Sequence, residues 1–252
     1  MVTAQFSYLH RPLNFGHRGA PKVAPENTLA SFQKAREMGA DGVELDVTLC
    51  ADGEVVVMHD DDVQRTTDGH GRLETLTLAQ VKALDAGVKF APSFAGERVP
   101  TFREVAQWAA DDMLLNVELK GLGVRSTGLE EKVVAIIREY GLDGRVILSS
   151  FNPFALIRAK RIAPDLPTGL LYARGLPIFL RRAWLRPLVR PNALHPHYDM
   201  VTDAYLLWAR SKGYRVNVWT ADQTLDLERL IEQKVDVIIT NRPDVLATML
   251  KR

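Results

Sequence analysis

The chain has 252 residues, of which 46% are hydrophobic and 25% are charged, and its formal net charge is +1. This near-neutral balance argues against nucleic-acid binding, which favours a surplus of basic residues. The single cysteine, Cys50, excludes an intramolecular disulfide framework. No apolar run approaches the about 18 residues of a membrane-spanning helix, and residues 1–11 contain no apolar core of signal-peptide length. We therefore expect a soluble, cytoplasmic protein.

The first predicted elements are a strand, a helix and a strand, over residues 13–17, 29–38 and 42–47. Asn27 or Thr28 can cap the helix. A short turn containing Asp52 and Gly53 then leads to another apolar run at 55–59. A parallel neighbour needs a crossover of about a dozen residues or more, whereas this turn suits a hairpin. We therefore expect 55–59 to be an antiparallel arm, which brings His59 towards the strand end that carries His17.

Residues 60–100 are polar, rich in glycine and weakly periodic, which indicates an insertion with one short helix near 78–84. Strands and helices then alternate. Strands are predicted over 114–120, 146–150, 168–172, 193–196, 215–220 and 235–240, and helical segments over 102–110, 129–140, 153–162, 178–189, 205–212, 225–233 and from 243. With the antiparallel arm set aside, eight strands are nearly all followed by helices. This count and the length predict a single α/β domain over 1–252, a (β/α)₈ TIM barrel with a small insertion after the second strand. A doubly wound open sheet is the alternative, but no Gly-x-Gly-x-x-Gly turn follows the first strand.

Three acidic residues point to a metal site. Glu44 and Asp46 lie two residues apart in a strand, so both carboxylates share one face. Glu118 occupies the same kind of position on the next barrel strand. Oxygen ligands of this kind suit hard divalent cations, Ca²⁺ or Mg²⁺, and Mn²⁺ fits the same set. A strand that simply faces solvent is the alternative for the first two acids.

Basic residues and histidines stand beside these acids at the predicted strand ends. Arg18 and Lys120, together with a metal, would form a pocket for an anion such as phosphate. An ion pair with one of the acids is the alternative for Lys120. His17 and His59 are the candidates for proton transfer, because imidazole titrates near neutral pH.

Five motifs in order resemble the glycerophosphodiester phosphodiesterases: His17-Arg18-Gly19, Pro25-Glu26-Asn27-Thr28, Glu44-Leu45-Asp46-Val47, Val57-Met58-His59-Asp60 and Val117-Glu118-Leu119-Lys120. Val218-Trp219-Thr220 and Ile239-Thr240-Asn241-Arg242-Pro243 follow the order of the family, so the resemblance covers about residues 13–245. One departure is Asn241, where many members have Asp.

The resemblance implies a TIM barrel with an insertion after the second strand, and hydrolysis of glycerophosphodiesters to sn-glycerol 3-phosphate and an alcohol. It implies roles for nine residues: metal ligands Glu44, Asp46 and Glu118, general acid and base His17 and His59, and substrate-site residues Arg18, Glu26, Lys120 and Trp219. A cyclic phosphate formed by the 2-hydroxyl of the substrate and direct attack by water are both open. In the first step we expect His17 to be the base and His59 the acid.

Two other functions compete with this reading. Residues 176–194 mix large apolar side chains with arginines, which suits contact with a membrane surface or an acyl chain. This mixture favours a lysophospholipase D or a phospholipase C-like enzyme, while a barrel helix with an exposed basic face is the plainer interpretation. The second alternative is a catalytically inactive barrel that binds phosphodiesters. The presence of all three carboxylates and both histidines argues against it.

Overall fold

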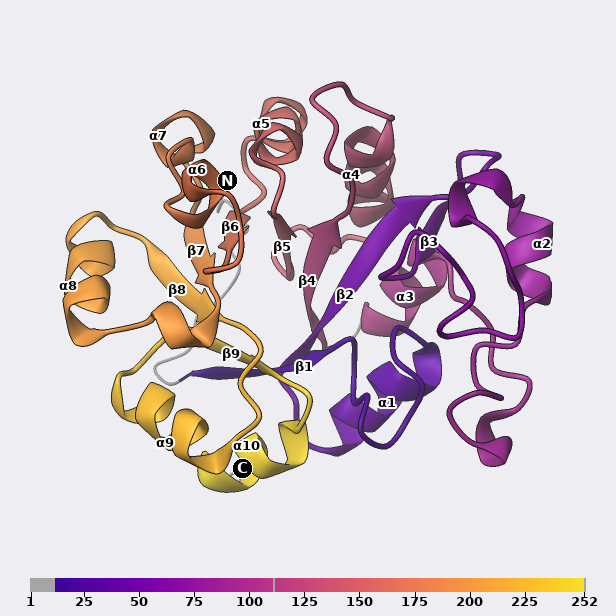
Figure 1. The fold of residues 1–252 in the computed structure, drawn as a ribbon, viewed down its shortest axis with the longest axis horizontal. Coiled ribbons are helices and arrows are strands. Elements are labelled where there is room, and N and C mark those ends of the chain that lie inside the picture. The colour runs from indigo at the N-terminus through magenta and orange to yellow at the C-terminus, as the bar shows by residue number, and fades with distance from the viewer. Residues whose placement is uncertain (1–11, 111, 252) are drawn as a thin grey trace.

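Eight parallel strands close into a barrel in the computed structural model, which describes residues 12–110 and 112–251 (Figure 1). The strands are Leu13–His17 (β1), Gly42–Leu49 (β2), Leu114–Leu119 (β4), Val146–Ser150 (β5), Thr168–Tyr172 (β6), Ala193–Pro196 (β7), Arg215–Val218 (β8) and Val237–Thr240 (β9). β1 pairs in parallel with both β2 and β9, which leaves no open edge between the first and last strands. The TIM-barrel prediction is confirmed, and the open-sheet alternative is wrong.

Helices follow the strands and cover the outside of the barrel (Figure 1). The longer ones are Leu29–Glu37 (α1), Phe102–Ala109 (α3), Leu129–Glu139 (α4), Pro153–Ile162 (α5), Asp203–Ser211 (α8), Thr224–Glu232 (α9) and Pro243–Met249 (α10). Thr28, not Asn27, caps α1, because its hydroxyl accepts a hydrogen bond from the Ser31 N–H. No helix among residues 12–110 and 112–251 is long and apolar enough to cross a membrane. Residues 1–11, for which we expect no signal-peptide core, lie outside the described residues.

The helical segment predicted over 178–189 is split into two short helices, Ile178–Arg181 (α6) and Arg186–Val189 (α7). Between them the backbone at Ala183 adopts a left-handed conformation, with φ of 48°. Pro187 stands in the first turn of α7, where its missing N–H costs no helical hydrogen bond. This connection is therefore a compact double turn instead of a regular barrel helix.

The hairpin arm is Val55–Val57 (β3), which pairs antiparallel with the end of β2 as predicted. The inserted segment that follows contains a 3₁₀ turn at Leu73–Thr75, the helix Leu78–Ala83 (α2) and a 3₁₀ turn at Pro92–Phe94. It has its own small apolar core, whose buried members include Val56, Met58, Val63, Leu73, Val81 and Val99. Because Val56 and Met58 belong to this core, it anchors the chain on both sides of Val57 and fixes the approach to His59.

Apolar side chains fill the lower part of the barrel and place the polar ones above them. Leu13 and Phe15 on β1 pack with Ile147, Ala193, Val237 and Ile239 from other strands. Alternate residues of a strand share a face, so His17 continues the inward face of Leu13 and Phe15. The barrel core thus forms a floor beneath the carboxyl ends of the strands.

Candidate active site

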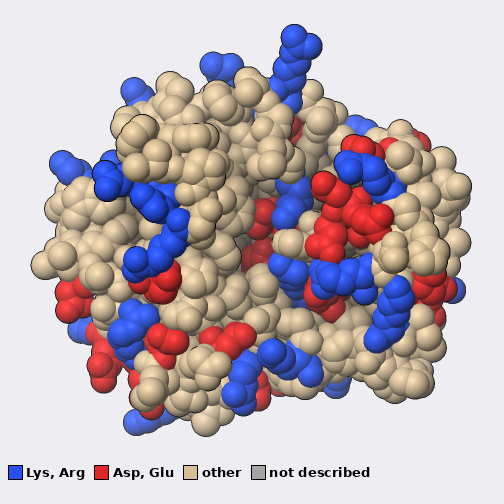
Figure 2. All heavy atoms as spheres, in the orientation of Figure 1, with Lys and Arg blue, Asp and Glu red and all other residues tan. Residues whose placement is uncertain are grey.

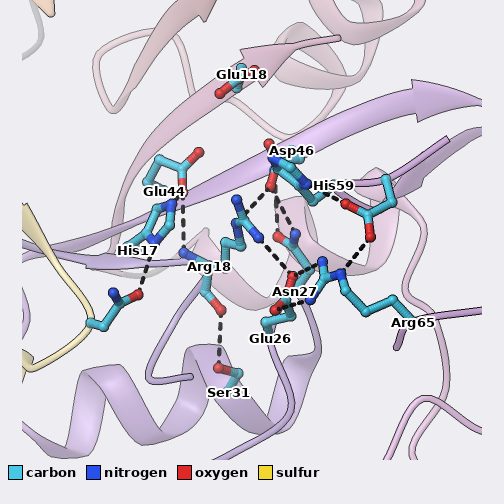
Figure 3. A network of polar contacts seen from close by, with 12 residues as sticks. His17, Arg18, Glu26, Asn27, Ser31, Glu44, Asp46, His59, Arg65 and Glu118 are labelled. Carbon is cyan, nitrogen blue, oxygen red and sulfur yellow. Dashed lines mark hydrogen bonds and ion pairs between the residues drawn. The ribbon is translucent and has the colours of Figure 1, made fainter. Parts of the chain in front are cut away.

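Three buried carboxylates meet at the carboxyl ends of two neighbouring strands (Figure 3). Asp46 on β2 lies opposite Glu118 on β4, and Glu44 lies one inward position earlier on β2. One oxygen atom from each of the three residues lies within 4.8 Å of the others. The register of β2 against β4 therefore brings together the acids that the sequence singled out, and they are buried, not facing solvent.

The charges of the cluster shift the pKa values of its members in opposite directions. Burial, together with the charge of Asp46, raises the pKa of Glu44 well above its usual range and that of Glu118 to about 7. Burial alone would raise the pKa of Asp46 too, but the charges of Lys120 and Arg18 lower it. Without a cation, the two glutamates are therefore protonated more readily than Asp46.

The residues of the cluster fit a hard divalent cation. All three ligand groups are carboxylates, with no thiol or imidazole among them. The buried Oδ1 atom of Asp46 accepts no hydrogen bond from the described part of the chain, although Lys120 Nζ lies 3.3 Å away. A buried carboxylate oxygen whose contact with a cationic side chain is this long is suited to a metal ligand. The cluster is thus compatible with a divalent cation.

Arg18 and Lys120 lie at the cluster, where both are paired with carboxylates. Lys120 Nζ is 3.1 Å from Glu118 Oε1, in addition to its contact with Asp46. Arg18 Nε is 3.3 Å from Asp46 Oδ2, and its backbone N–H donates to Glu44 Oε2 over 3.1 Å. The ion pair left open for Lys120 is therefore formed, and both cations also remain partly exposed towards the site.

Glu26 holds arginines in place. Its carboxylate accepts from Arg18 Nη1 over 2.8 Å and from both terminal nitrogens of Arg65 over 2.7 and 2.8 Å (Figure 3). Burial would raise the pKa of Glu26, but the hydrogen bonds from Arg65 and Arg18 lower it. Arg65 also donates to Asp60. Arg65 was not predicted as a site residue, because it lies in the insertion, where the sequence pattern is weak.

Asn27 is a further site residue that the sequence analysis considered only as a helix cap. Its backbone has a φ of 58°, and its Nδ2 donates to Asp46 Oδ2 over 2.9 Å. This bond fixes the second oxygen of Asp46. The position of Asn27 directly after Glu26 in the Pro25-Glu26-Asn27-Thr28 motif could have indicated that it belongs to the site.

The two histidines face the same pocket but have different partners. His59 Nδ1 lies 2.6 Å from Asp60 Oδ1, and because a carboxylate only accepts, Nδ1 carries the hydrogen of this bond. His17 Nδ1 lies 2.8 Å from the amide oxygen of Asn241, and its Nε2 lies 3.9 Å from Glu44. Burial and the charge of Arg18 lower the pKa of His17. These surroundings therefore favour the neutral form of His17.

Hydrogen bonds from Asn241 to Asp222 fix the tautomer of His17. Asn241 Nδ2 donates to Asp222 Oδ2 over 2.7 Å, and the Asn241 backbone N–H donates to Asp222 Oδ1 over 2.8 Å. A carboxylate only accepts, so the oxygen of the Asn241 amide is the atom left facing His17. His17 Nδ1 must then carry the proton. Its Nε2 presents a lone pair to the pocket.

The pocket between these groups has a volume of about 60 Å³ and two chemically different walls. One wall is polar, and the other is formed by Phe151, Leu171, Trp219 and Ile239. Trp219 is held there by a 2.8 Å hydrogen bond from its Nε1 to the His195 carbonyl, and it meets Phe151 edge to face at 5.3 Å. Trp219 was predicted, whereas the other three apolar residues were not assigned. In space-filling view, acidic and basic side chains gather in the hollow at the barrel mouth (Figure 2).

The raised pKa of Glu118 predicts that stability without a cation depends on pH. Glutamates of the unfolded chain titrate near 4.5, whereas Glu118 in the folded protein titrates near 7. Between these values the folded state binds more protons, so the free energy of unfolding contributed by Glu118 falls as the pH rises. His17 acts in the opposite direction. We therefore expect the Glu118→Gln variant to lack this contribution, so that its free energy of unfolding falls less than that of the wild type as the pH rises. Urea unfolding of both chelator-treated proteins across that pH range measures the difference. Parallel pH profiles of the two proteins would contradict the assignment.

Comparisons with known proteins agree with this geometry. Residues 17–245 match the model of the glycerophosphoryl diester phosphodiesterase family. A glycerophosphodiester phosphodiesterase of Caldanaerobacter subterraneus is 43% identical over 244 residues, which are 96% of this chain and 99% of that protein.

Two solved structures have the same fold. The glycerophosphodiester phosphodiesterase of Agrobacterium tumefaciens superposes with a TM-score of 0.82 at 27% identity, covering 94% of this chain and 99% of that one. A phosphodiesterase of Oleispira antarctica in complex with the product sn-glycerol-3-phosphate superposes with a TM-score of 0.81 at 31% identity, covering 96% and 98%.

Proposed function

Because this chain belongs to the glycerophosphoryl diester phosphodiesterase family, and is therefore a phosphoric diester hydrolase, we propose that two histidines and a divalent cation at the carboxylate cluster perform its reaction. The products are sn-glycerol 3-phosphate and an alcohol. The observation that carries this proposal is the pocket lined by His17, His59 and two carboxylates of the buried cluster, Glu44 and Glu118. The complex of the Oleispira phosphodiesterase with sn-glycerol-3-phosphate supports the choice of product.

Glu44, Asp46 and Glu118 would hold the cation, which is Ca²⁺, Mg²⁺ or Mn²⁺ by the chemistry of the ligands. When bound, it supplies Lewis-acid polarisation of a phosphate oxygen. Arg18 and Lys120 then place two positive charges beside the anionic substrate. The apolar wall with Trp219 accommodates the carbon atoms of the substrate.

His17 is the base of the first step and His59 is the acid. The lone pair on His17 Nε2 takes the proton of the attacking hydroxyl, while the proton on His17 Nδ1 stays hydrogen-bonded to the Asn241 amide oxygen. His59, paired through Nδ1 with Asp60, donates a proton from Nε2 to the oxygen of the leaving alcohol. If the 2-hydroxyl of the glycerol attacks, water opens the cyclic phosphate with the roles exchanged. Trapping of that intermediate separates this route from direct attack by water.

Release of sn-glycerol 3-phosphate from glycerophosphocholine and glycerophosphoethanolamine tests the function. We expect turnover to stop with EDTA and to return when Ca²⁺, Mg²⁺ or Mn²⁺ is added, because removal of the cation removes the polarisation of the phosphate oxygen. The comparisons do not favour the lysophospholipase D or phospholipase C-like alternative, so lysophosphatidylcholine serves as the contrasting substrate. Full activity in EDTA would refute the metal part of the proposal. Location in the cytoplasm stays a prediction from sequence.

Hydrogen bonds connect Asp222 through Asn241 to His17. We therefore expect Asn241→Leu to lower kcat by about 10–100-fold, the loss typical of a residue that orients an active-site side chain. Asn241→Asp keeps an acceptor for the Nδ1 proton and should lose less. The ¹⁵N chemical shifts of His17 should show the Nδ1–H tautomer in the wild type and a tautomer mixture in Asn241→Leu. Unchanged shifts in the leucine variant would contradict this role.

A further inference from the structure

The connection between β6 and β7 exposes an unusual density of apolar side chains. Ile178 and Phe179 are each 46% exposed, Trp184 is 57% exposed and Leu188 is 62% exposed. These four residues lie within and between the short helices α6 and α7. Exposed apolar residues that occur singly need no explanation, but a cluster of this kind marks a contact surface.

The connection between β4 and α4 adds two more such residues, Leu122 at 85% and Val124 at 65% exposure. The two connections are joined through α5. Arg158 on α5 donates to the Val124 carbonyl over 2.6 Å, and Lys160 on α5 donates to the Arg190 carbonyl. Both connections begin at the carboxyl ends of barrel strands, the ends at which the active site lies. We call the six apolar residues of these two connections the apolar rim.

Arginines accompany the apolar rim, and acidic residues are missing from the same stretch. No Asp or Glu occurs between Asp165 and Asp199. Arg174, Arg181 and Arg182 line an open groove of about 380 Å³ with Met200. Arg174 pairs with Asp199 over 3.0 Å, whereas Arg181 and Arg182 make no ion pair within the part of the chain that the structure describes. Figure 2 shows blue but no red side chains over α6 and α7.

We infer that the apolar rim and this arginine groove dock on the surface of an anionic phospholipid bilayer. Apolar side chains that include a tryptophan, interleaved with arginines, match the boundary between acyl chains and headgroups. The groove offers positive charge to phosphate headgroups, and anionic lipids attract such segments through their surface potential. This surface is distinct from the catalytic pocket and is not needed for hydrolysis of a diester in water.

Docking in this way turns the barrel mouth towards the lipid. The rim follows the same strand ends that carry the catalytic groups, so a bound molecule would hold its pocket close to the headgroup layer. The inference thus adds a place of action to the proposed function without depending on it. Failure of vesicle binding would leave hydrolysis of soluble diesters untouched, and loss of hydrolysis would leave vesicle binding untouched.

Cosedimentation with vesicles tests the inference. We expect binding to vesicles of phosphatidylglycerol and phosphatidylcholine that weakens with salt, and little binding to phosphatidylcholine alone. Arg181→Gln with Arg182→Gln should weaken it about fivefold for each arginine. Phe179→Ser, Trp184→Ser and Leu188→Ser combined should weaken it roughly tenfold or more. Soluble glycerophosphocholine should be hydrolysed normally by both variants, which also shows that they are folded.

Matched controls come from the outer helices. Leu207 on α8 and Leu225 on α9 are 69% and 79% exposed, and Leu207→Ser with Leu225→Ser should leave binding unchanged. Lys212→Gln with Lys251→Gln removes the same net charge as the arginine pair and should have a much smaller effect. Equal losses in test and control variants, or no wild-type binding at low salt, would overturn the inference. A concentration-dependent dimer that only the triple serine variant abolishes would assign the surface to a second copy instead and would overturn it too.

Discussion

His59→Gln is expected to lower kcat for glycerophosphocholine by about 10²–10⁴-fold, and His17→Gln by a similar factor, the usual contribution of a positioned acid or base. The two histidines have different hydrogen-bond partners, which assign them different roles. His59 is bonded to the carboxylate of Asp60, and His17 is bonded to the amide oxygen of Asn241. Choline is a poor leaving group that needs a proton, and the attacking hydroxyl needs to lose one. Each variant removes one of these transfers.

A diester with a nitrophenol leaving group separates the two roles. Nitrophenolate leaves without protonation, so His59→Gln should recover most of its activity on this substrate, whereas His17→Gln should not. Recovery in His17→Gln alone would reverse the assignment of acid and base. Near-full activity of both variants on glycerophosphocholine would remove both histidines from the mechanism. His70→Gln is the control, because His70 lies in the insertion and does not line the pocket.

Loss of one carboxylate of the cluster is the other large effect. Asp46→Asn is expected to weaken binding of the divalent cation by at least about 100-fold, more than the loss typical of a residue that only supports a ligand. Asp46 is 1% exposed, and it is the member of the cluster whose pKa is lowered. Calorimetric titration with Ca²⁺, Mg²⁺ and Mn²⁺ measures the affinity directly, and kcat should fall in parallel.

Asp46 also balances the charges of Arg18 and Lys120, so its removal disturbs more than a metal site. Glu118→Gln is the second variant, because the raised pKa of Glu118 makes its carboxyl group easier to protonate. This variant should weaken cation binding without lowering the stability of the protein at neutral pH. Glu54→Gln is the matched control on the same hairpin, where the carboxylate is exposed. Unchanged cation affinity in both Asp46→Asn and Glu118→Gln would exclude the cluster as the metal site.

Local patterns in the sequence were sufficient for much of the fold and for the catalytic groups. The period of two within a strand placed Glu44 and Asp46 on one face, and the short turn at Asp52 and Gly53 predicted the antiparallel arm. The alternation of strands and helices predicted the closed barrel. The motif resemblance named the family, which the comparisons bear out. These inferences depend on residues close together in the chain, or on motifs in a fixed order.

The partners of the charged groups were decided only by the tertiary structure. His17 meets Asn241 because β1 closes the barrel against β9, and Arg65 reaches Glu26 from the insertion. Such contacts depend on strand register, barrel closure and the path of a loop, and no local pattern encodes them. The same holds for the surface at α6 and α7, where a segment predicted as one helical stretch turns at Ala183. The sequence by itself determined which chemical groups this protein has at its strand ends, whereas the closed barrel decided which of them are neutral, charged or paired.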